Sequence, residues 1–140
     1  WYAVIDSRGL APEGWHLPSY DELYDMLFPY GGQSSANPYL KSKSGWSIES
    51  YSGLSQNGNN KSGFSVLPGG KRTFQEDKGS YRKPAIYQGK GDGAYFWLSP
   101  GPQNTNPSFF DITLPNRTSI SSFISVDYLG YGYSVRCIKD

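Results

Sequence analysis

Cysteine and histidine are nearly absent from this chain of 140 residues, which contains one of each. A single cysteine, Cys137, excludes a disulfide within the chain and a zinc site built on cysteines. Its place in an apolar alternation predicts a buried thiol that packs as a small hydrophobic residue. A single histidine, His16, means that any Ser-His-Asp or Cys-His mechanism must use that one ring. Because Trp15 and Leu17 flank it, we expect a structural histidine whose ring nitrogens bond to the backbone.

Long apolar runs and long runs of one charge are also missing. No stretch approaches roughly 18 consecutive apolar residues, so the sequence predicts no membrane span. The chain opens at Trp1 without a basic and then apolar stretch, so we expect no signal peptide in it. The formal net charge is +1, and no basic run is longer than a pair of residues. This pattern disfavours nucleic acid as a partner, because such proteins carry a basic surface. We therefore expect no nucleic-acid partner and no direct membrane insertion.

Glycine, proline and aromatic residues are abundant instead. The chain has 17 Gly, 10 Pro, 12 Tyr and 4 Trp, and only 18% of its residues are charged. This composition is typical of short strands joined by turns and long loops. The length suits one domain, which can bury an ordinary core without disulfides or metals.

One helix is predicted with clear start and stop signals. Ser19 can cap its N-terminus, and Glu22 completes a capping box. An apolar stripe at helical spacing follows at residues 23–27, and Pro29 then ends the helix. A second, short helix is predicted at residues 37–42, because a first-turn proline follows a capping-type residue there.

Elsewhere, short apolar runs bounded by Gly, Pro and Asn predict strands. These runs are residues 1–5, 64–67, 94–98, 109–114 and 133–138. Polar stretches between the runs predict long loops, at residues 55–62, 75–83, 100–107 and 116–122. The glycine-rich segment 89–93 predicts a turn and not a phosphate site, since no helix signal follows it. We expect the N-terminal and C-terminal strands to be neighbours.

Clusters that could carry chemistry have simpler structural explanations. The three acids at the helix start, Asp21, Glu22 and Asp25, fit the helix dipole better than a glycosidase pair. Amide-rich segments at residues 56–60 and 103–106 offer oxygen ligands, but neither matches a calcium-binding loop. The ligand type allows a structural calcium, and no other cofactor is predicted.

The order of several short motifs resembles one bacterial family. The motifs are Trp-Tyr at residues 1–2, Ala-Pro-Glu-Gly-Trp-His-Leu-Pro at 11–18, Leu-Lys-Ser at 40–42, Ser-Gly-Phe-Ser-Val-Leu-Pro-Gly-Gly at 62–70, Phe-Trp-Leu-Ser at 96–99 and Ser-Val-Arg-Cys at 134–137. In this order they resemble the Fibrobacter succinogenes major paralogous domain over nearly the whole chain.

The resemblance implies an architecture, because this family is similar in fold to C-type-lectin-like domains and to formylglycine-generating enzymes. We therefore expect an α+β, C-type-lectin-like single domain over residues 1–140, with one or two short helices, short antiparallel strands and long loops. It also implies a larger protein, extracellular or on the surface of a bacterial cell. Formylglycine-generating enzymes hold copper with paired cysteines, and sugar-binding C-type lectins carry Glu-Pro-Asn and Trp-Asn-Asp motifs. The chain has neither feature, so we expect no enzyme and no calcium-mediated sugar binding.

Tyrosine interleaved with Ser, Gly and Asn crowds the last third of the chain, a composition typical of adaptable binding loops. We predict a non-catalytic, adhesin-like recognition module that binds a glycan or a surface protein through loops of the C-terminal half. The predicted ligand-binding residues are Asn104, Asn106, Asn116, Arg117, Asp127, Tyr128, Tyr131 and Tyr133. Of Phe96 and Trp97, one ring is expected to face the core. The alternatives are an assembly subunit of a surface appendage, a receptor-binding protein with loops diversified by a retroelement and, less favoured, an enzyme on the formylglycine-generating scaffold.

Overall fold

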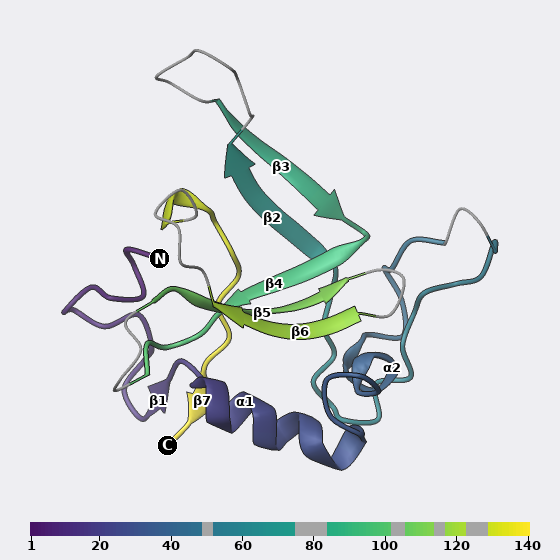
Figure 1. The fold of residues 1–140 in the computed structure, drawn as a ribbon, viewed down its shortest axis with the longest axis horizontal. Coiled ribbons are helices and arrows are strands. Elements are labelled where there is room, and N and C mark those ends of the chain that lie inside the picture. The colour runs from purple at the N-terminus through teal and green to yellow at the C-terminus, as the bar shows by residue number, and fades with distance from the viewer. Residues whose placement is uncertain (49–51, 75–83, 102–105, 114–116, 123–128) are drawn as a thin grey trace.

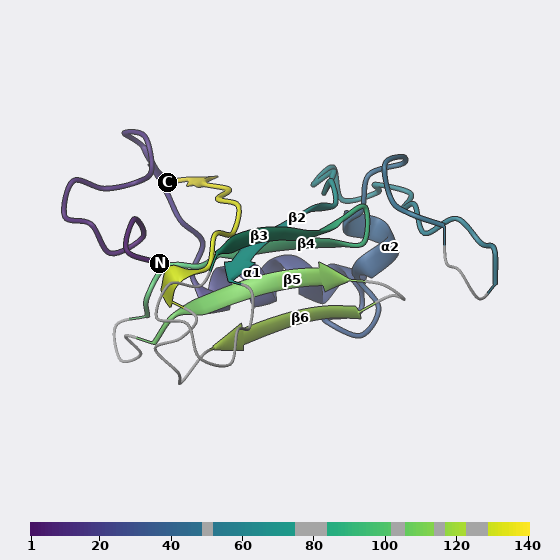
Figure 2. The same cartoon turned by 90° about the horizontal axis from the view of Figure 1, so that it is seen from above.

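The protein is a mixed α+β structure with two short α-helices and two small sheets. The computed structural model describes residues 1–48, 52–74, 84–101, 106–113, 117–122 (backbone only) and 129–140. In chain order the elements are β1 (Trp15–His16), α1 (Tyr20–Leu27), the 3-10 helix η1 (Phe28–Tyr30), α2 (Asn37–Leu40), β2 (Gly69–Phe74), β3 (Ala85–Lys90), β4 (Gly93–Trp97), β5 (Ser108–Thr113), β6 (Arg117–Ser122) and β7 (Ile138–Lys139). Helix α1 runs beneath the β4–β5–β6 part of the larger sheet (Figures 1 and 2).

The larger sheet has the strand order β3-β2-β4-β5-β6, and the smaller sheet pairs β1 with β7. All pairs are antiparallel except β2 with β4, which is parallel and joins Gly70 to Ala94. The prediction of antiparallel strands therefore fails at this one pair. On its other side, Gly70 permits a close approach of β2 to β3, because its φ is +73° and a Cβ there would lie 2.5 Å from the carbonyl oxygen of Gln88.

Helix α1 forms as predicted. The Ser19 hydroxyl accepts a hydrogen bond from the Glu22 amide at 3.3 Å, and the Glu22 carboxylate accepts one from the Ser19 amide at 2.9 Å. Leu23 and Leu27 are buried beneath the sheet. The short helix predicted at residues 37–42 is confirmed as α2, although its cap is Ala36, which offers no side-chain hydrogen bond.

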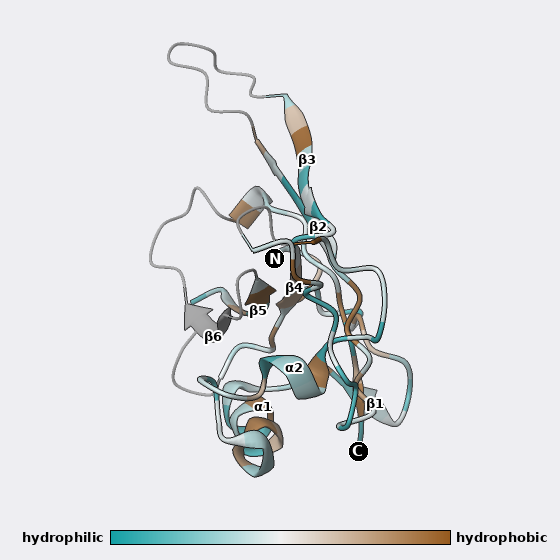
Figure 3. Ribbon diagram, turned by 90° about the vertical axis from the view of Figure 1, so that its right-hand side faces the viewer, coloured by the Kyte–Doolittle hydropathy of each residue, from teal (hydrophilic) through white to brown (hydrophobic). Residues whose placement is uncertain are grey.

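The two faces of β4 pack against different groups of residues, and we name these groups by what covers them. The helix-side core consists of Leu23, Leu27, Ala36, Leu40, Trp46, Val66, Ala94, Leu98, Phe110 and Ile112, and Phe96 packs against it. The loop-side cluster consists of Trp1, Trp97 and Phe109, packed by Val4, Tyr95, Leu129, Tyr131 and Tyr133. The apolar segments of β4, β5 and α1 stand out in Figure 3. Both Phe96 and Trp97 are therefore covered, where only one was expected to be.

Several predicted strands are wrong. Residues 1–5 form a turn, in which the Val4 amide donates to the Trp1 carbonyl at 2.7 Å. Residues 64–67 make only an isolated bridge through Val66, and residues 133–137 make one through Ser134, so the C-terminal strand is reduced to β7. The N-terminal strand beside β7 is β1 rather than residues 1–5. Conversely, the polar segment 117–122 is β6, because the antiparallel ladder of β5 pairs with its backbone.

Candidate functional site

A pocket of about 180 Å³ opens between α1 and the sheet, and we name it the α1–sheet pocket. Its lining comes from α1, β4, β5, β7 and the segments between them. The lining residues are Pro18, Glu22, Leu23, Met26, Phe64, Phe96, Leu98, Phe110, Arg136 and Ile138.

The floor of the pocket belongs to the helix-side core. Leu98 is 0% exposed and Phe110 is 1% exposed, so the opening reaches the best-buried part of the molecule. The Phe64 ring lies edge-on to both Phe96 and Phe110, with centroids 6.3 Å and 6.5 Å apart. Aromatic rings in this arrangement form an apolar wall with a defined shape.

The rim of the pocket carries a cation. The Arg136 guanidinium lies over the Phe64 ring, 4.3 Å from its centroid. Among the described residues no carboxylate forms an ion pair with Arg136, and its side chain is exposed. Stacking on a ring leaves the guanidinium edge, with its hydrogen-bond donors, open to a ligand.

The one acid at the pocket, Glu22, is already occupied. Its carboxylate accepts hydrogen bonds from the Ser19 amide at 2.9 Å, from the Ser19 hydroxyl at 2.7 Å and from the His16 ring at 2.8 Å. The bonds from Ser19, followed by the one from His16, lower the pKa of Glu22 to about 2. Glu22 is therefore ionised, and its carboxylate is engaged by Ser19 and His16 while the Arg136 guanidinium has no carboxylate partner among the described residues.

His16 is held between two carboxylates. Its Nδ1 lies 2.5 Å from Asp140 Oδ1, and its Nε2 lies 2.8 Å from Glu22 Oε1. The hydrogen bond to Asp140 and then the one to Glu22 raise the pKa of His16. Hydrogen bonds from the ring to the backbone were expected, and the structure shows bonds to side chains in their place. This network joins β1, α1 and the end of the chain beside β7, and both ring nitrogens are engaged in it.

The sequence model of the Fibrobacter succinogenes major domain matches residues 1–139. The chain belongs to this family. Its members are bacterial surface-associated domains. No curated protein and no solved structure matched the chain.

In this Fibrobacter succinogenes major domain, half of the predicted ligand-binding residues lie outside the part of the chain that the structure describes. Asn104, Asn116, Asp127 and Tyr128 lie outside the described residues. The backbone of Arg117 pairs with Thr113 at the start of β6, and Asn106 is exposed just before β5.

Among the described members of that predicted set, the structure brings together Tyr131 and Tyr133, with ring centroids 6.2 Å apart. Both belong to the loop-side cluster, where the Tyr133 ring lies 4.5 Å from Trp97 and 5.3 Å from Phe109. Each keeps part of its side chain exposed. These two tyrosines therefore contribute to packing, while their exposed parts remain accessible.

Residues of the α1–sheet pocket were not predicted as a site. Phe64 and Arg136 stand in the segments that carry the family resemblance, but nothing local to either segment places one beside the other. One signal was available in the sequence, because a single arginine, Arg136, stands inside the apolar alternation at residues 133–138. An unpaired charge is costly at a buried position, so the Arg136 side chain has to reach the surface.

In the amide-rich segment at residues 56–60, side-chain oxygens accept hydrogen bonds from backbone amides of the domain. Asn57 Oδ1 accepts from the Trp46 amide at 3.1 Å, and Asn60 Oδ1 accepts from the Ser65 amide at 2.7 Å. The described residues contain no group of three His, Cys, Asp or Glu side chains that could hold a metal ion.

Cys137 is half-buried, whereas a buried thiol was expected. None of the described helices has the length and apolar character needed to cross a membrane.

Proposed function

We propose that this domain is a non-catalytic recognition module of a bacterial cell-surface protein, and that it binds a partner protein by receiving one apolar side chain in the α1–sheet pocket. The observation that carries the proposal is the apolar lining, which runs from an open mouth to the helix-side core. We also propose the C-type-lectin-like fold for the domain. The pairing of β1 with β7, which joins an N-terminal segment to the C-terminal segment, supports it.

The size of the pocket favours an anchoring side chain over a free small molecule. Pockets for drug-sized ligands usually measure about 300–1,000 Å³, and this pocket measures about 180 Å³. Protein interfaces, in contrast, often depend on a few apolar or aromatic side chains that each fill a pocket on the partner.

The chemistry of the lining favours protein over sugar at this site. Sugar hydroxyls need hydrogen-bond partners, and burying them against Leu98 and Phe110 would leave those hydroxyls unpaired. An aromatic or leucine side chain has no such requirement. Arg136 then suits a carboxylate next to the anchor on the partner, because guanidinium and carboxylate form paired hydrogen bonds.

A non-catalytic role agrees with the state of His16. Its two ring nitrogens are engaged by carboxylates, so the ring offers no lone pair to act as a base. The Ser19 hydroxyl donates to Glu22 and not to a histidine, so Ser19 is not activated as a nucleophile.

A random peptide library displayed on phage and panned on the immobilised domain tests the proposal. We expect the selected peptides to share an aromatic residue or leucine beside Asp or Glu. Synthetic copies should lose binding to Met26→Trp, which fills the pocket, and should weaken on Arg136→Gln, which removes the charge. Tyr87→Ala is the control, because Tyr87 is 83% exposed on β3 and does not line the pocket.

The result that would overturn the proposal is enrichment of peptides without an apolar anchor, or equal binding of the selected peptides to Met26→Trp. A thermal melt of each variant checks that it is folded. If the library yields no binder and the domain instead shows concentration-dependent mass in solution, the assembly role replaces recognition of a separate partner.

A further inference from the structure

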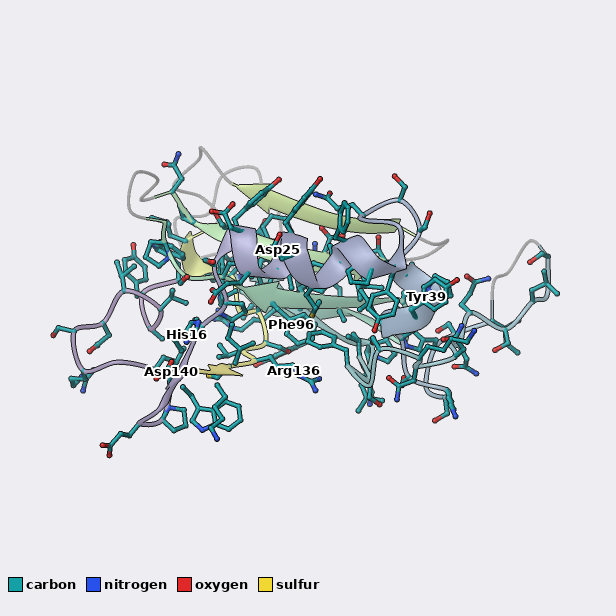
Figure 4. The ribbon with its side chains drawn as sticks, turned by 90° about the horizontal axis from the view of Figure 1, so that it is seen from below. His16, Asp25, Tyr39, Phe96, Arg136 and Asp140 are labelled. Atoms are coloured by element: carbon teal, nitrogen blue, oxygen red, sulfur yellow. The ribbon has the colours of Figure 1, made fainter. Side chains whose placement is uncertain are left out.

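A second concave surface lies at the other end of α1, where η1 leads into α2. It is an open groove of about 520 Å³, and we name it the tyrosine groove after Tyr30 and Tyr39. Lys61 and Ser35 complete its polar part, and two prolines line it as well. It shares no lining residue with the α1–sheet pocket. Figure 4 shows Tyr39 well separated from Arg136 and Phe96.

The two tyrosine rings form the aromatic wall of the groove. Their centroids are 5.4 Å apart and their planes are tilted by 31°. Each ring is half-buried, so each is anchored on one side and accessible on the other. Together they offer aromatic faces and phenolic hydroxyls in the same space.

The groove is built on a fixed backbone. The Tyr39 carbonyl accepts hydrogen bonds from the Ser62 amide at 3.1 Å and from the Ser62 hydroxyl at 2.8 Å. The Asn59 amide donates to the Pro38 carbonyl at 2.8 Å, which ties the segment that carries Lys61 to α2. Gly31 makes the tight turn possible, since a Cβ there would meet Ser35 Cβ at 2.8 Å. A site held in this way needs little ordering when a ligand binds.

Lys61 is the one charged side chain in the lining of the groove. Its ammonium lies 5.8 Å from the centroid of the Tyr39 ring. Within the described part of the chain no carboxylate forms an ion pair with it. The Lys61 amide donates to Asn59 Oδ1 at 3.0 Å, so the backbone beneath the charge is also held. The charge at the groove is therefore positive and uncompensated.

We propose that the tyrosine groove binds an acidic saccharide. The carbon face of a sugar ring can pack on the tyrosine rings, and its hydroxyls can bond to the phenols and to Ser35. A sugar carboxylate would meet the Lys61 ammonium. The volume lies within the range of about 300–1,000 Å³ typical of small-ligand sites, and the polar groups of the groove supply what the α1–sheet pocket lacks for a sugar.

The proposal does not depend on the proposed function, because the two sites share no residue. Calorimetric titration with digalacturonate and with its dimethyl ester provides the test, since the ester keeps the sugar rings and hydroxyls but carries no negative charge. We expect digalacturonate to bind more tightly than the ester. Lys61→Gln should weaken binding of digalacturonate by about twofold to fivefold, the range for one exposed charge contact, and leave binding of the ester unchanged.

Two further variants separate stacking from charge and from the other site. Tyr39→Ala should abolish binding of both probes, while Tyr39→Phe should retain most of it. Lys43→Gln, at an exposed lysine outside the groove, and Met26→Trp, in the α1–sheet pocket, should bind digalacturonate as the parent does.

The proposal is overturned if neither probe binds, or if Lys61→Gln affects the acid and the ester equally. A decaproline peptide is the rival probe, because grooves lined by tyrosine also suit proline-rich segments. The proposal is also overturned if this peptide binds, loses its binding in Tyr39→Ala, and digalacturonate does not bind. Thermal melts of Tyr39→Ala and Tyr39→Phe distinguish loss of a site from loss of the fold.

Discussion

The two faces of β4 are covered in different ways. On the helix side, α1 buries aliphatic residues completely, and Leu27, Leu40, Leu98 and Ile112 are each 0% exposed. On the loop side, flat rings brought by the chain ends and loops pack on Trp97, and most of them keep one edge exposed. A regular helix buries its apolar side chains deeply, but its backbone cannot adjust to fill every space against the sheet. The α1–sheet pocket therefore remains beside α1. Rings on loops can adapt to the surface that they cover.

The helix side also holds an unusual buried charge. Lys41 is 1% exposed, and its ammonium has no hydrogen-bond partner among the described residues. It lies over the Trp46 ring, 4.2 Å from the centroid. Burial lowers the pKa of Lys41 to about 8. The side of β4 that contributes the deepest burial thus also contains the least satisfied polar group.

Truncating one leucine on each side of β4 should give the largest difference in the free energy of unfolding. Leu27→Ala removes a fully buried side chain, and we expect it to lower the free energy of unfolding by about 2–5 kcal/mol. Leu129→Ala on the loop side should cost clearly less, because Leu129 is only partly buried. Urea denaturation of both variants measures the contrast. Equal losses would mean that the two sides contribute equally.

Lys41 should make the stability of the helix side depend on alkaline pH. Its folded pKa of about 8 lies below the ordinary value of 10.5, so folding is opposed most strongly below pH 8, where the lysine is charged in both states. Stability should rise as pH increases from about 8 to about 10.5, by up to about 3 kcal/mol. Denaturation at several pH values measures this rise.

Lys41→Met is the matched variant, since methionine fills a similar volume without charge. It should be more stable than the parent at pH 7.5, and the difference between the two proteins should shrink as pH rises toward 10.5. A constant difference across this window would show that the ammonium is stabilised by its contact with Trp46.

Enlarging a residue on each side of β4 should show which side has free space. Gly93→Ala places a Cβ 2.9 Å from the Tyr95 ring, which is stacked on Tyr133 and has little room to move. We expect a loss of about 1–2 kcal/mol. Met26→Phe extends into the α1–sheet pocket and should cost less than about 1 kcal/mol. The same denaturation assay compares them, and the reverse order would mean that the pocket is closed in solution.

Local signals predicted the elements whose interactions are themselves local. The capping box of α1 joins Ser19 to Glu22 within one turn, so those two residue types at that spacing are enough to place the helix start. The family resemblance rested on motifs in a fixed order and was confirmed over residues 1–139.

Strands were predicted less well, because a strand depends on a neighbour that the local sequence does not show. Residues 1–5 have the apolar character of a strand, yet they turn so that the Trp1 ring reaches Trp97, with centroids 5.7 Å apart. Residues 117–122 look like a polar loop and become β6 because β5 offers a free edge. The intrinsic strand propensity of a segment therefore contributes less to strand formation than its pairing with a neighbouring strand.

The sequence by itself determined the family and the position of α1. Tertiary structure alone decided where the α1–sheet pocket and the tyrosine groove lie. Phe64, Phe96 and Arg136 come from separate segments, and Tyr39 and Lys61 are likewise separated along the chain. The reason is physical, since capping and turn formation act within a few residues. A pocket, in contrast, requires side chains that only the packing of distant segments brings into contact.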